Sequence, residues 1–256
     1  MFVFVTDHIV LQRVENDADL RTCAWAFGRF LMQMRDFPAS ALHNVLPYSH
    51  DSDGRLRAIA AAAEEDRMGR AGECRREIDF LLERREYMDH LARMRDQGLL
   101  PVRVTHNDTK VNNVLLDRTT REALCVVDLD TVMPGLAAYD FGDTVRTGAS
   151  LAGEDSDPDG PVFSMVRFGA CASGYLSACG TVLTREEKET LADGALLTTL
   201  ETAGRFLKDY LIGDVYFRIS DPKQNLRRAR TQIRLAAEME GKLDEMRLVV
   251  RRCAEG

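Results

Sequence analysis

One stretch, residues 102–130, constrains the fold more than any other part of this chain. It alternates apolar runs, which favour short strands, with polar segments, which favour loops: runs at 102–104, 114–116 and 124–127, and polar segments at 105–113 and 117–122. The second polar segment has the length of a hairpin connector. A small sheet of this kind fixes side chains where its strands end. We therefore expect Asp108 and Asp128 to lie at the mouth of the sheet, with Asn113 beside them.

The spacing of the polar residues in this stretch indicates a chemistry. His106, Asp108 and Asn113 follow the pattern H-x-D-x-x-x-x-N, and Asp128 ends the next apolar strand. Phosphoryl transfer needs one carboxylate that takes the proton of the attacking hydroxyl, and an amide oxygen and a second carboxylate that hold Mg²⁺. Each member of the set occurs by chance elsewhere, whereas the whole set with its strand context is specific. The pattern predicts a phosphoryl-transfer site.

Composition excludes several classes of protein. The net charge of −7 and the pI near 5.4 argue against a nucleic-acid partner, which a basic face would attract. The six cysteines are scattered without a C-x-x-C pair, so we expect buried reduced thiols and no structural metal. The N-terminal sequence lacks the basic start of a signal peptide, and no apolar run reaches the length of a membrane span. We predict a cytoplasmic protein.

The rest of the chain is predominantly helical in pattern. Apolar residues at helical spacing, with caps and Gly or Pro stops, predict helices over these segments: 17–34 behind an Asn16 cap, 55–97 as one long charged helix ended by Gly98, 162–179, 184–213 behind a capping box, and 226–253. Two apolar segments, 2–5 and 9–11, predict short strands. The pattern therefore favours one α+β domain over residues 1–256, mainly helical, with a small central β-hairpin.

Three polar groups outside the central stretch receive structural interpretations. Asp140, Asp143 and Arg146 share one helical face, and for Asp140 and Arg146 we favour a cap and salt-bridge cluster. The loop histidines, His43 and His50, are expected to be solvated. The acidic segment 151–161 lacks the ligand order of an EF-hand and is expected to be a mobile surface loop.

With these residues in view, the chain resembles the kinase-like superfamily of aminoglycoside phosphotransferases and choline kinases. More narrowly, it is similar to the N-acetylhexosamine 1-kinases. The narrower resemblance rests on motifs spread over nearly the whole chain, at 26–28, 36–38, 103–110, 128–135, 140–143, 205–207 and 209–211. The motifs at 103–110 and 128–135 are the most distinctive.

The resemblance implies the large, C-terminal lobe of a protein-kinase-like fold and transfer of the γ-phosphate of ATP, with Mg²⁺, to the anomeric hydroxyl of an N-acetylhexosamine. It implies a role for each of the following residues: Asp108 as catalytic base, Asn113, Asp128 and Asp130 as metal ligands, Thr131, Arg205 and Tyr216 in the sugar pocket, and Phe2, Val3, Phe4 and Val5 in an interlobe hinge, within residues 1–12, whose backbone meets adenine.

The sequence departs from the family at its beginning. A kinase of this type carries a small lobe with a Gly-rich phosphate loop and a strand lysine, and neither occurs here, so we expect the chain to start at the hinge. Weak ATP affinity and self-association through exposed hinge residues, or cover by a separate small lobe, would follow.

Three interpretations remain open: a sugar 1-kinase, a pseudokinase that binds a sugar or a partner, and a choline- or aminoglycoside-type kinase. An upstream reading frame that encodes the Gly-rich and lysine-bearing strands would favour the first interpretation over the second. The choice between sugar and amine acceptors separates the first from the third.

Overall fold

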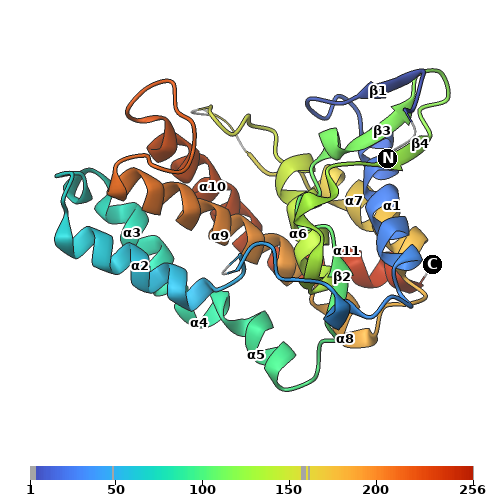
Figure 1. Cartoon of the computed structure of the whole chain (residues 1–256), viewed down its shortest axis with the longest axis horizontal. Coiled ribbons are helices and arrows are strands. Elements are labelled where there is room, and N and C mark those ends of the chain that lie inside the picture. Colours follow the sequence, from blue (N-terminus) through green and yellow to red (C-terminus); the bar gives the residue numbers. More distant parts are fainter. Residues whose placement is uncertain (1–3, 48, 157–159, 161, 256) are drawn as a thin grey trace.

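The computed structural model describes residues 4–47, 49–156, 160 and 162–255, and it confirms a mainly helical α+β fold (Figure 1). The helices are α1 Asp17–Gln33, α2 Ser52–Glu65, α3 Arg75–Glu83, α4 Arg85–Met88, α5 His90–Asp96, α6 Ala137–Gly148, α7 Met165–Cys179, α8 Arg185–Glu189, α9 Leu191–Ile212, α10 Gln224–Glu240 and α11 Leu243–Glu255. The strands are β1 His8–Val10, β2 Arg103–Thr105, β3 Val114–Asp117, β4 Ala123–Val126 and β5 Met133–Gly135. Within the described residues, every helix is too short or too polar to cross a bilayer.

Helices α6 and α9 cross at the centre of the molecule with their backbones in close approach (Figure 1). A Cβ atom added to Gly142 would lie 2.4 Å from the carbonyl oxygen of Gly194, and one added to Gly194 would lie 2.2 Å from that of Ala138. Only glycine fits at either position without moving a helix. This crossing fixes α6, whose first turn supports residues 106–132, which we call the catalytic segment.

The apolar core connects α6 to the pair α1 and α7. Phe141 of α6 packs against Phe168 and Tyr175 of α7, with ring centroids 5.9 and 5.3 Å apart, and all three rings are buried. On α1, Leu20 and Phe27 are fully buried at helical spacing. The prediction of a helix behind an Asn16 cap is confirmed, because Asn16 Oδ1 accepts a hydrogen bond from the backbone N–H of Asp19.

Two small antiparallel sheets flank the catalytic segment. The first has the order β1–β3–β4, with Ile9 opposite Leu116, and the second pairs β2 with β5. The predicted strands at 102–104, 114–116 and 124–127 are confirmed within one or two residues. Residues 133–135 form strand β5, which closes the loop 106–132 at its base.

The predicted N-terminal strand is wrong for the residues that can be assessed. Phe4 and Val5 are in no strand, and Phe4 is 81% exposed. Phe2 and Val3 lie outside the described residues. The second predicted strand, 9–11, is confirmed within one residue as β1, which is half-buried and pairs with β3.

The long helix expected over 55–97 is divided into shorter helices. Asp66 ends α2 in the left-handed region at φ 37°, and Gly69 follows at φ 65°. These backbone angles reverse the chain, so that α3 lies beside α2. Similarly, the final helix is broken at Gly241 into α10 and α11.

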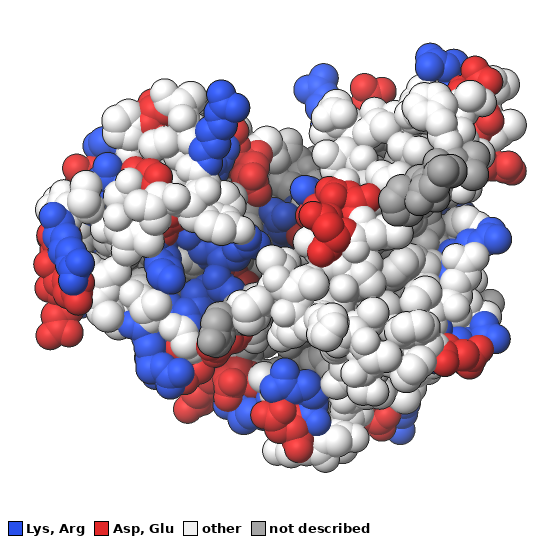
Figure 2. All heavy atoms as spheres, viewed as in Figure 1, with Lys and Arg blue, Asp and Glu red and all other residues white. Residues whose placement is uncertain are grey.

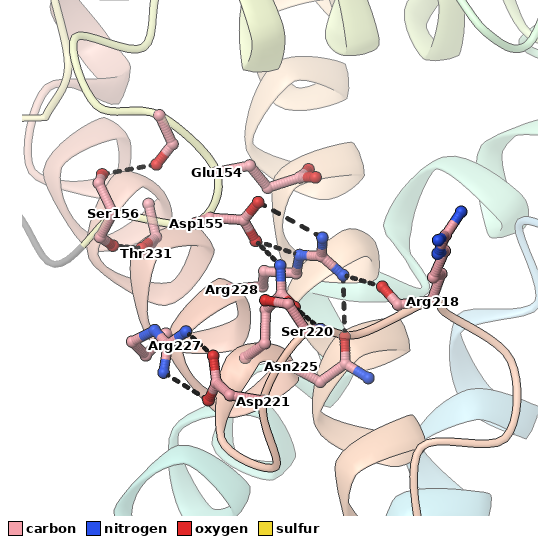
Figure 3. Close-up of polar contacts among 12 residues, drawn as sticks. Glu154, Asp155, Ser156, Arg218, Ser220, Asp221, Asn225, Arg227, Arg228 and Thr231 are labelled. Atoms are coloured by element: carbon pink, nitrogen blue, oxygen red, sulfur yellow. Dashed lines mark hydrogen bonds and ion pairs between the residues drawn. The ribbon is translucent and has the colours of Figure 1, made fainter.

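The acidic segment expected to be mobile is tied to one face of α10 (Figure 3). We call the described residues within 151–163 the strap. Its contacts come from α10 residues three or four positions apart: Gln224 and Arg228 to Asp155, Thr231 to Ser156, Arg234 to Gly160, and Glu238 to the backbone N–H groups of Val162 and Phe163. Arg146 of α6 also binds Glu154 at 3.0 Å. The strap follows α6 in the chain, and side chains of both α6 and α10 hold its described part in place.

Candidate active site

A buried carboxylate holds the backbone of the catalytic segment. The two oxygens of Asp140, in the first turn of α6, accept hydrogen bonds from the backbone N–H groups of His106 and Asn107, each at 2.8 Å. Thr109 Oγ1 donates to the Asp140 carbonyl at 2.6 Å. Burial raises the pKa of Asp140 to about 6, against the lowering effect of the two N–H donors. The predicted salt-bridge cluster is confirmed for Arg146, which binds Asp143 at 2.8 Å, and is wrong for Asp140, whose carboxylate supports the segment that carries Asp108.

His106 and Thr131 fix the same segment from its other side. The buried His106 ring places Nε2 3.0 Å from the carbonyl oxygen of Val127 and meets the Phe27 ring edge-on at 5.5 Å. Thr131 Oγ1 donates to the His106 carbonyl at 2.7 Å. Thr131, predicted to line the sugar pocket, thus has its hydroxyl proton engaged within the catalytic segment.

Asp108 stands at the open end of this support. Its side chain is 23% exposed, and the Lys110 ammonium lies 2.9 Å from Oδ2. Asn113 Nδ2 donates to the Asp108 carbonyl oxygen at 2.8 Å and to Oδ2 at 3.0 Å. The geometry brings the predicted base and a predicted metal ligand into direct contact, and it leaves Asn113 Oδ1 for a further partner.

Asp128 and Asp130 are exposed carboxylates at the end of β4. Asp128 adopts the left-handed conformation at φ 67°, which turns the chain sharply after the strand. The hydrogen bond with Asp130 raises the pKa of Asp128; burial and the negative charges of Asp130 and Asp108 act in the same direction, and Lys110 opposes them. Asp130 disfavours the charged form of Asp128, and a bound cation would offset this repulsion.

The donor set fits a Mg²⁺ ion that keeps part of its water. Among the described residues, no group of three or more His, Cys, Asp or Glu side chains forms a ready-made metal cage. An amide oxygen from Asn113 with one or two carboxylates from Asp128 and Asp130 matches the way Mg²⁺ is held together with phosphate oxygens. Those three residues would hold the ion.

A cavity of about 410 Å³ adjoins the catalytic segment at Asn107, the neighbour of Asp108. We call it the Arg205 pocket. Arg205 and Tyr216, both predicted to line the sugar site, lie on its wall, whereas Thr131 is absent from it. The Arg205 guanidinium lies 5.9 Å from the Tyr216 ring centroid and 5.4 Å from that of Phe217. In the described part of the chain, Arg205 has no ion-pair partner.

The Arg205 pocket has a cationic lining. Arg55, Arg205 and Lys208 contribute positive charge, and Asp209 is the one acidic residue among its described walls. The oxygens of Asp209 are already occupied by the backbone N–H groups of residues 215–217 and by the Asn225 amide. Figure 2 shows basic side chains gathered in the hollow at the centre of the face that it displays.

His50 lies beside this pocket and departs from the solvated state expected of it. Its ring stacks on Tyr139 with centroids 3.7 Å apart, and Nδ1 lies 2.7 Å from the buried Glu201. Ser52 Oγ also donates to Glu201, at 2.7 Å. Burial acts to raise the pKa of Glu201, but His50, Arg55 and Ser52 outweigh it and bring the pKa below 4.5. These contacts anchor His50 against α9 through Glu201 and against α6 through Tyr139.

Cavity size does not by itself identify the site. A cavity of about 930 Å³ along the start of α1 contains none of the predicted site residues. The structure brings Asp108, Asn113, Asp128 and Asp130 to one region. Arg205 and Tyr216 line a pocket that reaches this region at Asn107. Thr131 supports the backbone of the region and does not line the pocket. Sequence analysis missed Asn107, Lys110 and Asp140 as members of this region. Their signal was present in the motifs 103–110 and 140–143.

Comparisons with known proteins agree with this geometry. A family model described as the phosphotransferase enzyme family matches residues 4–159. An ethanolamine kinase from Plasmodium vivax is similar in structure, with a TM-score of 0.55 and 13% identity over 92% of this chain and 67% of that one. A choline kinase from Cryptosporidium parvum Iowa II gives a TM-score of 0.54 and 14% identity over 99% of this chain and 73% of that one.

At these identities the structural likeness establishes the kinase-like fold alone, as expected from the sequence. The family match covers more than half of the chain and includes the whole catalytic segment with Asp108, Asn113, Asp128 and Asp130. This chain belongs to the phosphotransferase enzyme family.

Proposed function

We propose that this protein transfers the γ-phosphate of ATP, with Mg²⁺, to the anomeric hydroxyl of an N-acetylhexosamine. The observation that carries the proposal is the position of the Arg205 pocket. It meets the catalytic segment at Asn107, next to Asp108, and its lining is cationic and aromatic. Such a lining suits an uncharged polar acceptor with hydroxyl and amide groups better than a cationic one.

The chain's own residues account for the acceptor half of the reaction. Asp108 takes the proton of the attacking hydroxyl as the new O–P bond forms, and the bond between the γ-phosphorus and the bridging oxygen of ADP breaks. Lys110 and Asn113, both in contact with Asp108 Oδ2, hold that carboxylate in position. A Mg²⁺ ion at Asn113 and Asp128 would neutralise charge on the phosphates.

Kinases of the choline, ethanolamine or aminoglycoside type are the alternative class. Two similar structures carry the names ethanolamine kinase and choline kinase, and those names describe those proteins. A cationic acceptor entering the Arg205 pocket would face Arg205 and Lys208, while Asp209 has its oxygens occupied. This repulsion argues for the sugar.

A binding module without turnover is the other alternative. A protein of that kind has no need for a base and a metal set in contact. Here Asp108 and Asn113 are hydrogen-bonded and Asp128 lies within electrostatic reach of Asp108. The retained set argues for catalysis.

The test is transfer of radiolabelled γ-phosphate to a panel of acceptors: N-acetylglucosamine, N-acetylgalactosamine, glucosamine, choline, ethanolamine and an aminoglycoside. N-acetylglucosamine and glucosamine form a matched pair that differs mainly in charge. We expect transfer to the acetylated sugar, at least about 10-fold weaker transfer to glucosamine, and loss of about 100-fold or more in Asp108→Asn.

Two results would contradict the proposal. Transfer to choline or ethanolamine in preference to both acetylated sugars would assign the protein to the alternative class of kinases. Binding of a sugar without transfer, by wild type and by Asp108→Asn equally, would favour the binding module.

A further inference from the structure

A small polar compartment lies at the inner end of the Arg205 pocket. It has a volume of about 40 Å³ and shares Ser49, Asn107 and Arg205 with the larger pocket. Asp143 and Thr202 also line it. This volume accommodates a hydroxyl group or a water molecule.

Two oxygens at this compartment are buried without a hydrogen-bond partner among the described residues. One is Asn107 Oδ1 and the other is Asp143 Oδ2. The amide of Asn107 is fixed in orientation, since Nδ2 donates to both oxygens of Thr105 and to the Thr131 carbonyl. Asp143 is fixed as well, because Oδ1 is bound by Arg146 at 2.8 Å. Buried acceptors without donors are costly, which indicates that a partner from outside the chain supplies the donor.

We propose that Asp143 determines acceptor specificity by binding a hydroxyl group of the acceptor through Oδ2, together with Asn107 Oδ1. The proposal rests on the proposed function, in which the Arg205 pocket receives a sugar. Asp143 acts on binding and orientation and does not touch the transferred phosphate.

The charges around the compartment favour a neutral hydroxyl over an ammonium group. The wall holds two carboxylates, Asp143 and Glu201, and each already has a partner: Arg146 binds Asp143, and His50 binds Glu201. Arg205 on the same wall adds a positive charge that opposes an entering cation. A hydroxyl adds no charge and shares its one proton between the two oxygens in a bifurcated hydrogen bond, where a water molecule would donate one proton to each.

The test measures binding rather than turnover. N-acetylglucosamine and its 3-, 4- and 6-deoxy analogues are titrated calorimetrically into wild type, Asp143→Ala and Glu154→Gln. In wild type we expect one analogue to bind roughly 10- to 100-fold more weakly than the parent sugar, the usual worth of a hydrogen bond to a charged group. In Asp143→Ala the parent and that analogue should bind within about 3-fold of each other.

Glu154→Gln is the matched control, because Glu154 is the other carboxylate bound to Arg146 and lies outside the compartment. It should keep the wild-type difference between parent and analogue. If Asp143→Ala does not fold, Asp143→Asn keeps the side-chain size and replaces Oδ2 by an N–H₂ donor. This variant should reduce the same difference.

The outcomes separate the two proposals. An unchanged set of differences in the Asp143 variants would show that the compartment holds water only, and it would overturn the assignment. Failure of wild type to bind any of the sugars would overturn it too. Sugar binding with the expected coupling, but without phosphate transfer, would contradict the kinase proposal while leaving the role of Asp143 intact.

Discussion

The carboxylates around the catalytic segment fall into two groups with opposite surroundings. Asp140 is buried, and both of its oxygens accept backbone N–H groups. Asp128 and Asp130 are exposed, and Asp130 raises the pKa of Asp128. The backbone uses the acceptor oxygens of Asp140, even though burial raises its pKa to about 6, whereas the second group would need a bound cation to offset its charges. The same type of side chain, an aspartate, thus supports the fold in one place and is available to a ligand in the other.

This contrast teaches how to separate support from chemistry in a polar cluster. A carboxylate whose acceptor capacity is used by the backbone contributes to stability and has little left for a ligand. A carboxylate that faces another carboxylate costs stability until a cation arrives. Substitutions in the two groups should therefore have opposite signatures in activity and in stability.

The largest expected effect on activity comes from the exposed group, Asp128 and Asp130. Asp128→Asn should lower the rate of phosphate transfer at least about 100-fold, because the proposed metal ligand loses its charge. Its free energy of unfolding should stay within about 0.5 kcal/mol of wild type, since Asn tolerates the left-handed backbone and the repulsion with Asp130 is removed. Initial rates and urea unfolding measure the two quantities. A loss of stability above about 1.5 kcal/mol would move Asp128 into the structural group.

The buried group should show the converse. Asp140→Asn replaces an acceptor oxygen with an N–H₂ group and leaves one backbone N–H without its partner, which should cost about 1.5–3 kcal/mol of unfolding free energy. The midpoint of urea unfolding measures it. Asp130→Asn, an exposed neighbour of the site, serves as the control and should change the midpoint little. Equal midpoints for the two variants would erase the distinction between the groups.

Glu201, another buried carboxylate, sharpens the comparison through pH. Its folded pKa lies below 4.5, so its ionised form stabilises the folded state above about pH 4.5, and this contribution is lost as pH falls through the folded pKa. Glu201→Gln should cost about 1 kcal/mol near neutral pH, and less under acid conditions, where wild type loses the same interaction. Urea unfolding at about pH 7 and about pH 4 tests this. An equal cost at the two pH values would show that the folded pKa of Glu201 is not lowered.

Local patterns allowed much of this structure to be predicted. Alternation and connector length located strands β2, β3 and β4, and the Asn16 and Thr184 caps located the starts of α1 and α8. Each of these signals acts within a few residues, so tertiary structure does not override it. The grouping of Asp108, Asn113 and Asp128 could likewise be predicted from their spacing, because the flanking strands β2, β3 and β4 fix their positions.

The errors arise where partners distant in sequence decide the outcome. Asp140 looked like a helix cap, but its carboxylate binds a segment more than thirty residues earlier. His50 looked solvated, but Glu201 and Tyr139 bury it. The strap looked mobile because it is acidic, and the arginines that hold it come from α6 and α10. Local sequence carries no record of such partners.

The glycine crossing of α6 and α9 has a consequence for how the chain is made. The residues that carry the chemistry, 108–130, leave the ribosome well before α9, Leu191–Ile212, has been synthesised. Yet α6, whose Asp140 holds their backbone, rests at Gly142 against Gly194 of that later helix. During synthesis the emerging catalytic segment therefore lacks its final support, and nascent chains released before α9 should bind neither substrate. The order of synthesis delays the assembly of the site until the second half of the chain is complete.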